Sequence, residues 1–128
     1  MANLLIVHAD QLMQGLLELA FRRAGHTAEC AADADEALCR LRRPAAALPD
    51  ALVVQLELPG EDGVALALKV RHLPGAERLP VLLIMDVPDH GGHGRVAAAA
   101  LSRAALYDGM DRPAGASGAL ARLLSDST

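Results

Sequence analysis

Three histidines are the side chains of this sequence best suited to hold a metal ion. His8 follows a short apolar run, and His90 and His93 stand on either side of two glycines. Imidazole nitrogens, together with carboxylates, are ligands that Zn²⁺ accepts. The His90-Gly-Gly-His93 stretch, however, lacks a regular ligand spacing such as HExxH and is typical of a solvated loop. We therefore expect no bound metal, and His8, His90 and His93 remain the candidates for the opposite case.

No pattern of residues indicates a catalytic nucleophile. The cysteines Cys30 and Cys39 do not form a CxxC pair, and both suit packing as free thiols in a reducing compartment. No order of Ser, His and Asp, or of Cys and His, suggests a hydrolase. The glycines that flank His93 lack the GK[ST] ending of a phosphate-binding loop. We expect that the chain is not an enzyme.

Five short apolar runs, each expected to form a strand, alternate with helical patterns. The strands are expected at residues 4–7, 27–31, 51–56, 81–85 and 105–109. This alternation predicts an α/β fold with one parallel sheet and helices on both of its faces. In such a sheet, ligands bind beyond the C-terminal ends of the strands. Residues at those ends are therefore the candidates for a functional site.

The expected helices carry recognisable start and stop signals. Asp10 is expected to cap the first helix and Gly25 to end it. Either Asp33 or Asp35 can cap the second, and Ser117 the last. The fourth helix is expected at about 95–103, after a loop at 88–94. The apolar face of the first helix is assigned to Met13, Leu16, Leu17, Ala20, Phe21 and Ala24.

Length and composition bound the class of protein. The 128 residues suit a single domain spanning 1–128, and 52% hydrophobic residues suffice for a packed core. A formal net charge of −4 does not favour nucleic-acid binding. No apolar run approaches the ~20 residues of a membrane span, and no signal peptide is recognisable. We expect a cytoplasmic domain that binds neither membrane nor nucleic acid.

One stretch of the sequence resembles a known family. Residues 49–63, PDALVVQLELPGEDG, are similar to the PDLVLLDLxLPGMDG-like stretch of response-regulator receiver domains. Leu79-Pro80-Val81-Leu82 matches the start of the family's fourth strand, and Arg112-Pro113 stands at its Lys-Pro pair. The resemblance implies a flavodoxin-like fold: five helices around a five-stranded sheet of order 2-1-3-4-5. It also makes the bond before Pro113 a candidate for the cis form, which only X–Pro bonds adopt at low cost.

Every position that carries the family's chemistry differs in this chain. The acidic pair falls on His8 and Ala9, the phosphoacceptor aspartate on Gln55, the switch hydroxyl on Met85 and the lysine on Arg112. The aromatic of the fifth strand falls on Gly109, and nearby Tyr107 is the candidate for its role. An acyl phosphate needs a carboxylate nucleophile, and Mg²⁺ prefers carboxylate oxygens. The substitutions therefore predict neither phosphorylation nor a Mg²⁺ cofactor.

The resemblance and its departures together predict an atypical receiver, or pseudo-receiver, of the two-component phosphorelay type. It would serve signal transduction through phosphorylation-independent protein–protein interaction. In the family, the fourth helix, fifth strand and fifth helix form the usual partner surface, and a homodimer is a further expectation. The alternative is a small-ligand or metal-sensing domain that uses the vacated pocket through His8, His90, His93 and Arg112.

Overall fold

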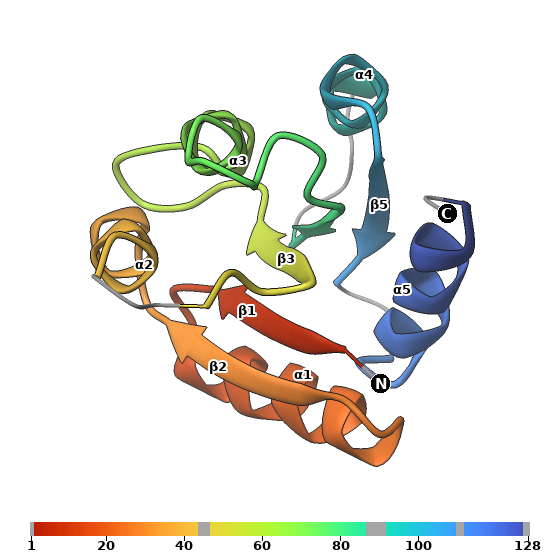
Figure 1. Ribbon diagram of the computed structural model, residues 1–128. Helices are drawn as coiled ribbons and strands as arrows, with labels where there is room; N and C mark the ends of the chain where they lie inside the picture. Colours follow the sequence, from red (N-terminus) through yellow and green to blue (C-terminus); the bar gives the residue numbers. More distant parts are fainter. Residues whose placement is uncertain (1, 44–46, 87–91, 110–111, 127–128) are drawn as a thin grey trace.

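The computed structural model describes residues 2–43, 47–86, 92–109 and 112–126, in which five strands alternate with five helices (Figure 1). The strands are β1 (Asn3–Val7), β2 (Thr27–Ala31), β3 (Ala51–Gln55), β4 (Val81–Met85) and β5 (Ala104–Asp108). The helices are α1 (Gln11–Arg23), α2 (Ala34–Leu41), α3 (Gly63–Arg71), α4 (His93–Leu101) and α5 (Gly115–Asp126).

The strands form one parallel sheet in the order β2-β1-β3-β4-β5. Helices α1 and α5 cover one face of the sheet, and α2, α3 and α4 cover the other (Figure 1). This arrangement confirms the predicted doubly wound fold and its strand order. Of the helices that the structure describes, none is both long enough and apolar enough to cross a membrane.

The central strands β1, β3 and β4 are buried along almost their whole length. Their residues are nearly all aliphatic, because a central strand between two helical layers has no solvent-facing side. Leu17, Phe21 and Leu120 fill the core on the side of α1 and α5. Leu66 and Val70 lie in the core on the opposite side.

The prediction that Leu16 belongs to the core face of α1 is wrong. Leu17 and Phe21 are buried, whereas Leu16 is exposed. Successive residues of an α-helix point about 100° apart, so Leu16 falls outside a core face centred on Leu17 and Phe21. The apolar surface of α1 is therefore wider than the part that the sheet covers.

Aspartate side chains cap the starts of α1 and α2, as the sequence predicted. The Asp10 carboxylate accepts hydrogen bonds from the backbone N–H groups of Leu12 and Met13, which confirms it as the N-cap of α1. Asp33 caps α2, which decides between the two predicted candidates. Gly25 adopts a φ of +93° just after α1, a conformation that costs glycine little.

Two helices begin earlier than predicted. Helix α4 starts at His93 and ends at Leu101, because Ser102 has a φ of 57° and breaks the helical path. Helix α5 starts at Gly115, so Ser117 does not cap it and instead donates its hydroxyl to the carbonyl oxygen of Ala114. The described residues contain no cis peptide bond, so the expectation of a cis bond before Pro113 is also wrong.

Candidate functional site

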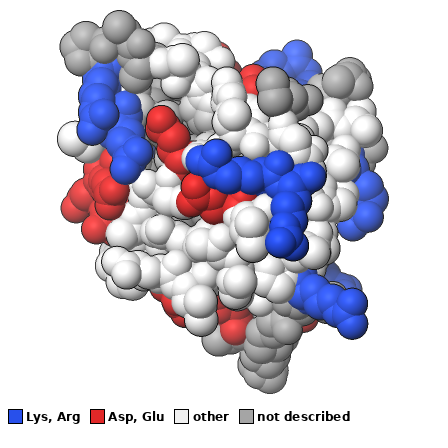
Figure 2. All heavy atoms as spheres, turned by 90° about the horizontal axis from the view of Figure 1, so that it is seen from below, with Lys and Arg blue, Asp and Glu red and all other residues white. Residues whose placement is uncertain are grey.

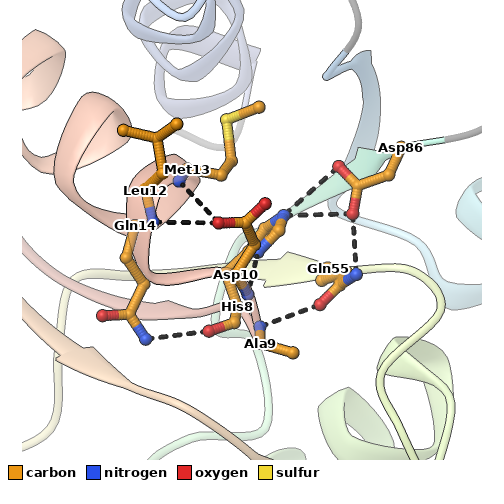
Figure 3. Close-up of polar contacts among 8 residues, drawn as sticks. All are labelled: His8, Ala9, Asp10, Leu12, Met13, Gln14, Gln55 and Asp86. Atoms are coloured by element: carbon orange, nitrogen blue, oxygen red, sulfur yellow. Dashed lines mark hydrogen bonds and ion pairs between the residues drawn. The ribbon is translucent and has the colours of Figure 1, made fainter.

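Three polar side chains meet at the C-terminal ends of β1, β3 and β4 (Figure 3). His8 follows β1, Gln55 is the last residue of β3, and Asp86 follows β4. The register of the sheet pairs Gln55 with Ile84, so Asp86 lies just beyond that pair at the same edge. The chain leaves β1 and β3 toward opposite faces here, and ligands of doubly wound sheets bind at such a point.

The carboxylate of Asp86 is the centre of this network. Its Oδ2 accepts a hydrogen bond from Nε2 of Gln55 at 2.7 Å. Nε2 of His8 lies 3.0 Å from Oδ2 and 3.2 Å from Oδ1 of the same carboxylate. The His8 residue is 2% exposed, whereas the Asp86 side chain is 26% exposed. The imidazole is thus shielded from solvent, and the carboxylate that faces it is not.

The hydrogen bonds of His8 define which ring nitrogen carries the proton in its neutral form. Nδ1 accepts a hydrogen bond from the backbone N–H of Asp10 at 3.0 Å. A backbone N–H can only donate, so Nδ1 must be unprotonated in this geometry. The proton of the neutral ring is therefore on Nε2, where it is donated to Asp86. Both ring nitrogens have protein partners, which leaves His8 no lone pair for a metal ion in this arrangement.

The amide of Gln55 joins the network from the other side. Its Oε1 accepts a hydrogen bond from the backbone N–H of Ala9 at 2.9 Å, while its Nε2 donates to Asp86. Ala9 thus takes part through its backbone, although its side chain supplies no polar group. The two contacts fix the orientation of the amide and connect the strand ends of β1, β3 and β4.

Gln14 supports the same edge from the first turns of α1. Its Nε2 donates to the carbonyl oxygen of His8 at 2.8 Å and to that of Ala31 at 3.1 Å. The backbone N–H of His8 also donates to the carbonyl of Ala31 at 3.1 Å. The sequence prediction missed Gln14, although its place four residues after the helix cap Asp10 was a usable signal.

The position that the resemblance assigns to the switch aromatic has no room for a side chain. A Cβ atom on Gly109 would lie 2.8 Å from Cγ2 of Ile84, 2.9 Å from Oδ1 of Asp86 and 3.0 Å from the carbonyl oxygen of Met85. The Asp86 carboxylate therefore occupies space that an aromatic ring here would need. A side chain at position 109 and the observed position of the Asp86 carboxylate are therefore not compatible.

Tyr107, the candidate for the aromatic's role, packs toward α5. Its hydroxyl donates to the carbonyl oxygen of Arg112 at 2.5 Å. A Cβ atom on Gly115 would collide with that hydroxyl, so the start of α5 approaches the ring closely. Tyr107 also borders the core on the side of α1 and α5. These contacts hold the ring at the start of the helix.

Met85 and Arg112, the remaining predicted site residues, lie at the margin of the network. Met85 is half-buried and accepts a hydrogen bond from Gly109 N–H through its carbonyl oxygen at 2.7 Å. Arg112 is exposed, and its carbonyl oxygen accepts from Tyr107 and from Gly115 N–H. Asp86, which the sequence places at the end of the fourth predicted strand and so among the candidates for the site, provides the contact that ties the strand ends together.

The predicted metal candidates fall largely outside what the structure describes. His90 lies outside the described residues, and of His93 only the backbone, at the start of α4, is described. Within the described part of the chain, no group of three or more His, Cys, Asp or Glu side chains is arranged to hold a metal ion.

Comparisons with known proteins agree on one family, although no protein-family model matches the sequence. Among curated proteins, the chain is 32% identical over 84 residues to the transcriptional regulatory protein AfsQ1 of Streptomyces coelicolor, covering 66% of this chain and 35% of that protein. It is 30% identical over 79 residues to the phosphate regulon transcriptional regulatory protein PhoB of Rhizobium meliloti, covering 62% of this chain and 34% of that protein. The chain thus spans about a third of the length of these relatives.

Solved structures match over nearly the full chain. A putative response regulator from Chloroflexus aurantiacus has a TM-score of 0.81 and 30% identity, covering 97% of this chain and 98% of that one. The chemotaxis response regulator CheY4 of Vibrio cholerae has a TM-score of 0.82 at 20% identity, covering 96% of this chain and 98% of that one. The latter likeness concerns the fold alone.

Proposed function

Because this chain belongs to the response-regulator receiver family of two-component signalling, we propose that it is an atypical receiver that acts through phosphorylation-independent protein–protein interaction. The proposal is carried by the hydrogen-bonded network of His8, Gln55 and Asp86 at the edge where the family's chemistry occurs. Gln55 stands at the phosphoacceptor position, and an amide cannot form an aspartyl phosphate.

The same network supports a domain that works without Mg²⁺ and catalyses no reaction. Mg²⁺ binds through hard oxygen ligands, chiefly carboxylates, in octahedral geometry. His8 and Ala9 supply no side-chain oxygen at the family's acidic pair. Asp86 is the carboxylate of this network, and it already accepts hydrogen bonds from two side chains. A cation that bound Asp86 would lie close to the side chains of both donors and would lack the other carboxylate ligands of the family's site.

The surface we propose for a protein partner is formed by α4, β5 and α5. Strand β5 is an edge strand whose residues are all at least partly exposed. A groove of about 460 Å³ runs along it and is lined by β5 and α5 residues together with Arg103. Val96 of α4 adds an exposed apolar side chain. Together these features offer backbone and apolar contacts to a partner without any change at the network.

The proposal is tested by offering the domain a phosphoryl donor. The protein would be incubated with Mg²⁺ and acetyl phosphate and its intact mass measured, beside Gln55→Asp and the triple variant His8→Asp, Ala9→Asp, Gln55→Asp. We expect no phosphoryl adduct on the native sequence, and Mg²⁺-dependent modification of the triple variant, which regains nucleophile and metal ligands together. Gln11→Asp, on the exposed start of α1, controls for an added carboxylate outside the pocket. A phosphoryl adduct on the native protein would overturn the proposal.

A further inference from the structure

A cavity of about 710 Å³ lies where the first residues of β1 and β2 meet the end of α2. Helix α2 has eight residues and ends at Leu41, so it is about 12 Å long. Strand β2 beneath it is about 16 Å long, and the helix therefore does not cover the whole strand. A volume of about 300–1,000 Å³ is typical of sites that bind small molecules.

Three arginines from separate segments line this cavity. Arg22 belongs to α1, Arg40 to α2, and Arg43 to the segment that follows α2. Among the lining residues that the structure describes, Glu29 of β2 is the one carboxylate. The lining thus carries three positive charges against one negative, in a chain whose formal net charge is −4. Figure 2 looks at the molecule from below, the side of α1 and β2, and shows basic side chains in separate groups, with acidic side chains beside them.

Two of the arginines are held in position by neighbouring groups. Nε of Arg22 donates to Oε1 of Glu18 at 2.9 Å, and a terminal nitrogen donates to the carbonyl oxygen of Ala28 at 3.1 Å. Arg40 donates to Oε1 of Glu36 at 3.3 Å. Neither of these two glutamates is among the residues that line the cavity. Because a guanidinium group has five N–H donors, both arginines keep donors that these contacts do not use.

Arg43 completes the set without an ion pair of its own. It is exposed, and within the described part of the chain it has no ion-pair partner. Its neighbour Arg42 is exposed as well but is not among the lining residues. Guanidinium groups bind carboxylate and phosphate oxygens through paired N–H donors. The charge at Arg43 is therefore available to an anion in the cavity.

An apolar wall lies in the same cavity. Leu41, Leu48 and Pro49 are half-buried lining residues, and the two leucines also pack against the core. A cationic rim beside an apolar wall suits an organic anion better than a free inorganic one. No aromatic ring is among the lining residues that the structure describes. The wall therefore favours an aliphatic group over a nucleobase, which binds by stacking.

We propose that this cavity binds a small phosphorylated organic molecule, with its phosphate at the three arginines and an aliphatic part against Leu41 and Leu48. A phosphate monoester carries about −1.5 to −2 charges at pH 7 and has three strong acceptor oxygens. This charge matches the excess of two positive charges in the lining, whereas a carboxylate would supply only one negative charge. The cavity lies at the N-terminal ends of β1 and β2, so the inference is independent of the network at their C-terminal ends.

Amide NMR of the isotope-labelled protein, titrated with butyl phosphate, tests the site. Inorganic phosphate and butanoate would be titrated in parallel at matched ionic strength. We expect saturable shifts at Leu5, Glu29 and Arg43 with butyl phosphate. Binding should be at least about fivefold weaker for inorganic phosphate, which lacks the alkyl group, and for butanoate, which has a single charge. Absence of a saturable shift, or equal affinity for either comparison anion, would overturn the proposal.

Arg43→Ala should weaken the binding of butyl phosphate by at least about fivefold. The midpoint of thermal unfolding should stay the same, because this side chain has no ion pair within the described chain. Arg42→Ala is the matched control, since it removes the same charge one residue away and outside the lining. If both variants weakened binding equally, the attraction would be a general effect of surface charge and the proposal would be wrong.

Glu29→Gln should have the opposite effect and strengthen the binding of butyl phosphate about threefold. The change removes the carboxylate that repels an anion in the cavity. The Glu29 side chain is 76% exposed, so the substitution should not disturb the fold. Glu57→Gln, an exposed position outside the lining, should leave the affinity unchanged. An affinity that Glu29→Gln lowers or leaves unchanged would contradict the proposed place of the phosphate.

The same titration separates this site from the proposed function. The amide signals of Ala9, Gln55 and Asp86 lie at the opposite ends of the strands and should stay in place while those at the cavity move. Shifts centred on Gln55 would place the anion in the family's phosphorylation pocket and would overturn the cavity as its site. Failure of butyl phosphate to bind anywhere would overturn this inference and leave the proposed function as it stands.

Discussion

The two edges of the sheet satisfy their polar groups in different ways. At the C-terminal edge, His8, Gln55 and Asp86 come from three strand ends and bond to one another. At the N-terminal edge, the single side chain of Arg71 bonds to backbone carbonyl oxygens that precede β4 and β5. The C-terminal cluster thus shares its contacts among several side chains, whereas the contacts around Arg71 depend on one.

Arg71 holds the turn between α4 and β5 against the segment before β4. Its guanidinium donates to the carbonyl oxygens of Leu79 at 2.8 Å and Ser102 at 2.7 Å, and also to that of Leu101 at the end of α4. Ser102 and Arg103 both have positive φ, a backbone conformation that is strained for residues other than glycine. Burial, and secondly the nearby Arg103, lowers the pKa of Arg71.

The two clusters differ in the kinds of groups that Arg71 and Asp86 contact: backbone carbonyl oxygens in one case and side chains from other strand ends in the other. The carbonyls around Arg71 are the unpaired acceptors expected near a helix end, and a cation there is structural. The network at His8 has side chains from separate strands at the family's reactive position, yet its donors and acceptors are matched to one another. Loss of Arg71 should therefore affect stability more than the loss of any one hydrogen bond at the other edge.

The largest effect is expected from Arg71→Ala. The change removes the guanidinium hydrogen bonds that join Leu79 to the turn at Leu101 and Ser102, and we expect it to lower the free energy of unfolding by about 3 kcal/mol. Urea unfolding followed by circular dichroism measures this. Arg71→Lys should recover part of the loss, because an ammonium group cannot reach all of the carbonyls. Arg78→Ala, at an exposed position in the same region, should change stability by less than about 0.5 kcal/mol.

At the opposite edge, Gly109→Ala is expected to lower the free energy of unfolding by about 2 kcal/mol through overpacking. The added methyl group would collide with the side chains of Ile84 and Asp86. Because Asp86 must move, the amide NMR signals of His8 and Gln55 should shift as well. Gly15→Ala is the control, since its methyl group meets no described atom and should stabilise the helix. An unchanged stability for Gly109→Ala would mean that Asp86 does not occupy that space.

Asp86→Asn should have a smaller effect, about 1 kcal/mol, because it keeps the shape and removes one acceptor. Its new NH₂ group would face a donor of His8 or of Gln55. His8 cannot accept through Nε2 without moving its proton to Nδ1, where it would oppose Asp10 N–H. Nitrogen-15 NMR of the imidazole should show the Nε2–H tautomer in the native protein at neutral pH. An Nδ1–H tautomer would contradict the network.

The smallest expected effect is a pH dependence at the N-terminal edge. Burial, and secondly the positive chain terminus, lowers the pKa of His26, whose Nδ1 accepts a hydrogen bond from Ala2 N–H. A lowered pKa means that the unfolded chain binds more protons, so stability falls as the pH drops through the unfolded value of 6.5. His26→Asn, which retains an acceptor, should make the loss of stability between pH 7.5 and 5.5 shallower. An unaltered slope would exclude this contribution.

Most of the fold could be predicted because its signals are local. The aliphatic runs of β1, β3 and β4 and the capping residue Asp10 act within a few neighbouring residues. The end of α4 could not be predicted, because it depends on the contact between Arg71 and Ser102, which are distant in sequence. The position of Leu16 was misjudged because an apolar residue beside the core face looks the same in the sequence as one within it.

The site was predictable by position but not by contact. The family pattern indicated that His8 and Gln55 stand where metal ligands and phosphoacceptor would be. The role of Asp86 depends on the register of β3 against β4, which brings residues 31 positions apart into hydrogen-bonding distance. The orientation of the His8 ring depends in turn on Asp10 N–H. Neither contact leaves a repeating pattern in the sequence.

Titration of the isotope-labelled protein with Mg²⁺ and beryllofluoride, followed by backbone amide NMR, tests the central claim most directly. The claim is that the network of His8, Gln55 and Asp86 has replaced a phosphorylation site. We predict that the amide signals of Ala9, Gln55 and Asp86 stay in place throughout the titration, while those of the triple aspartate variant move. A saturable shift centred on Gln55 in the native protein would contradict the claim.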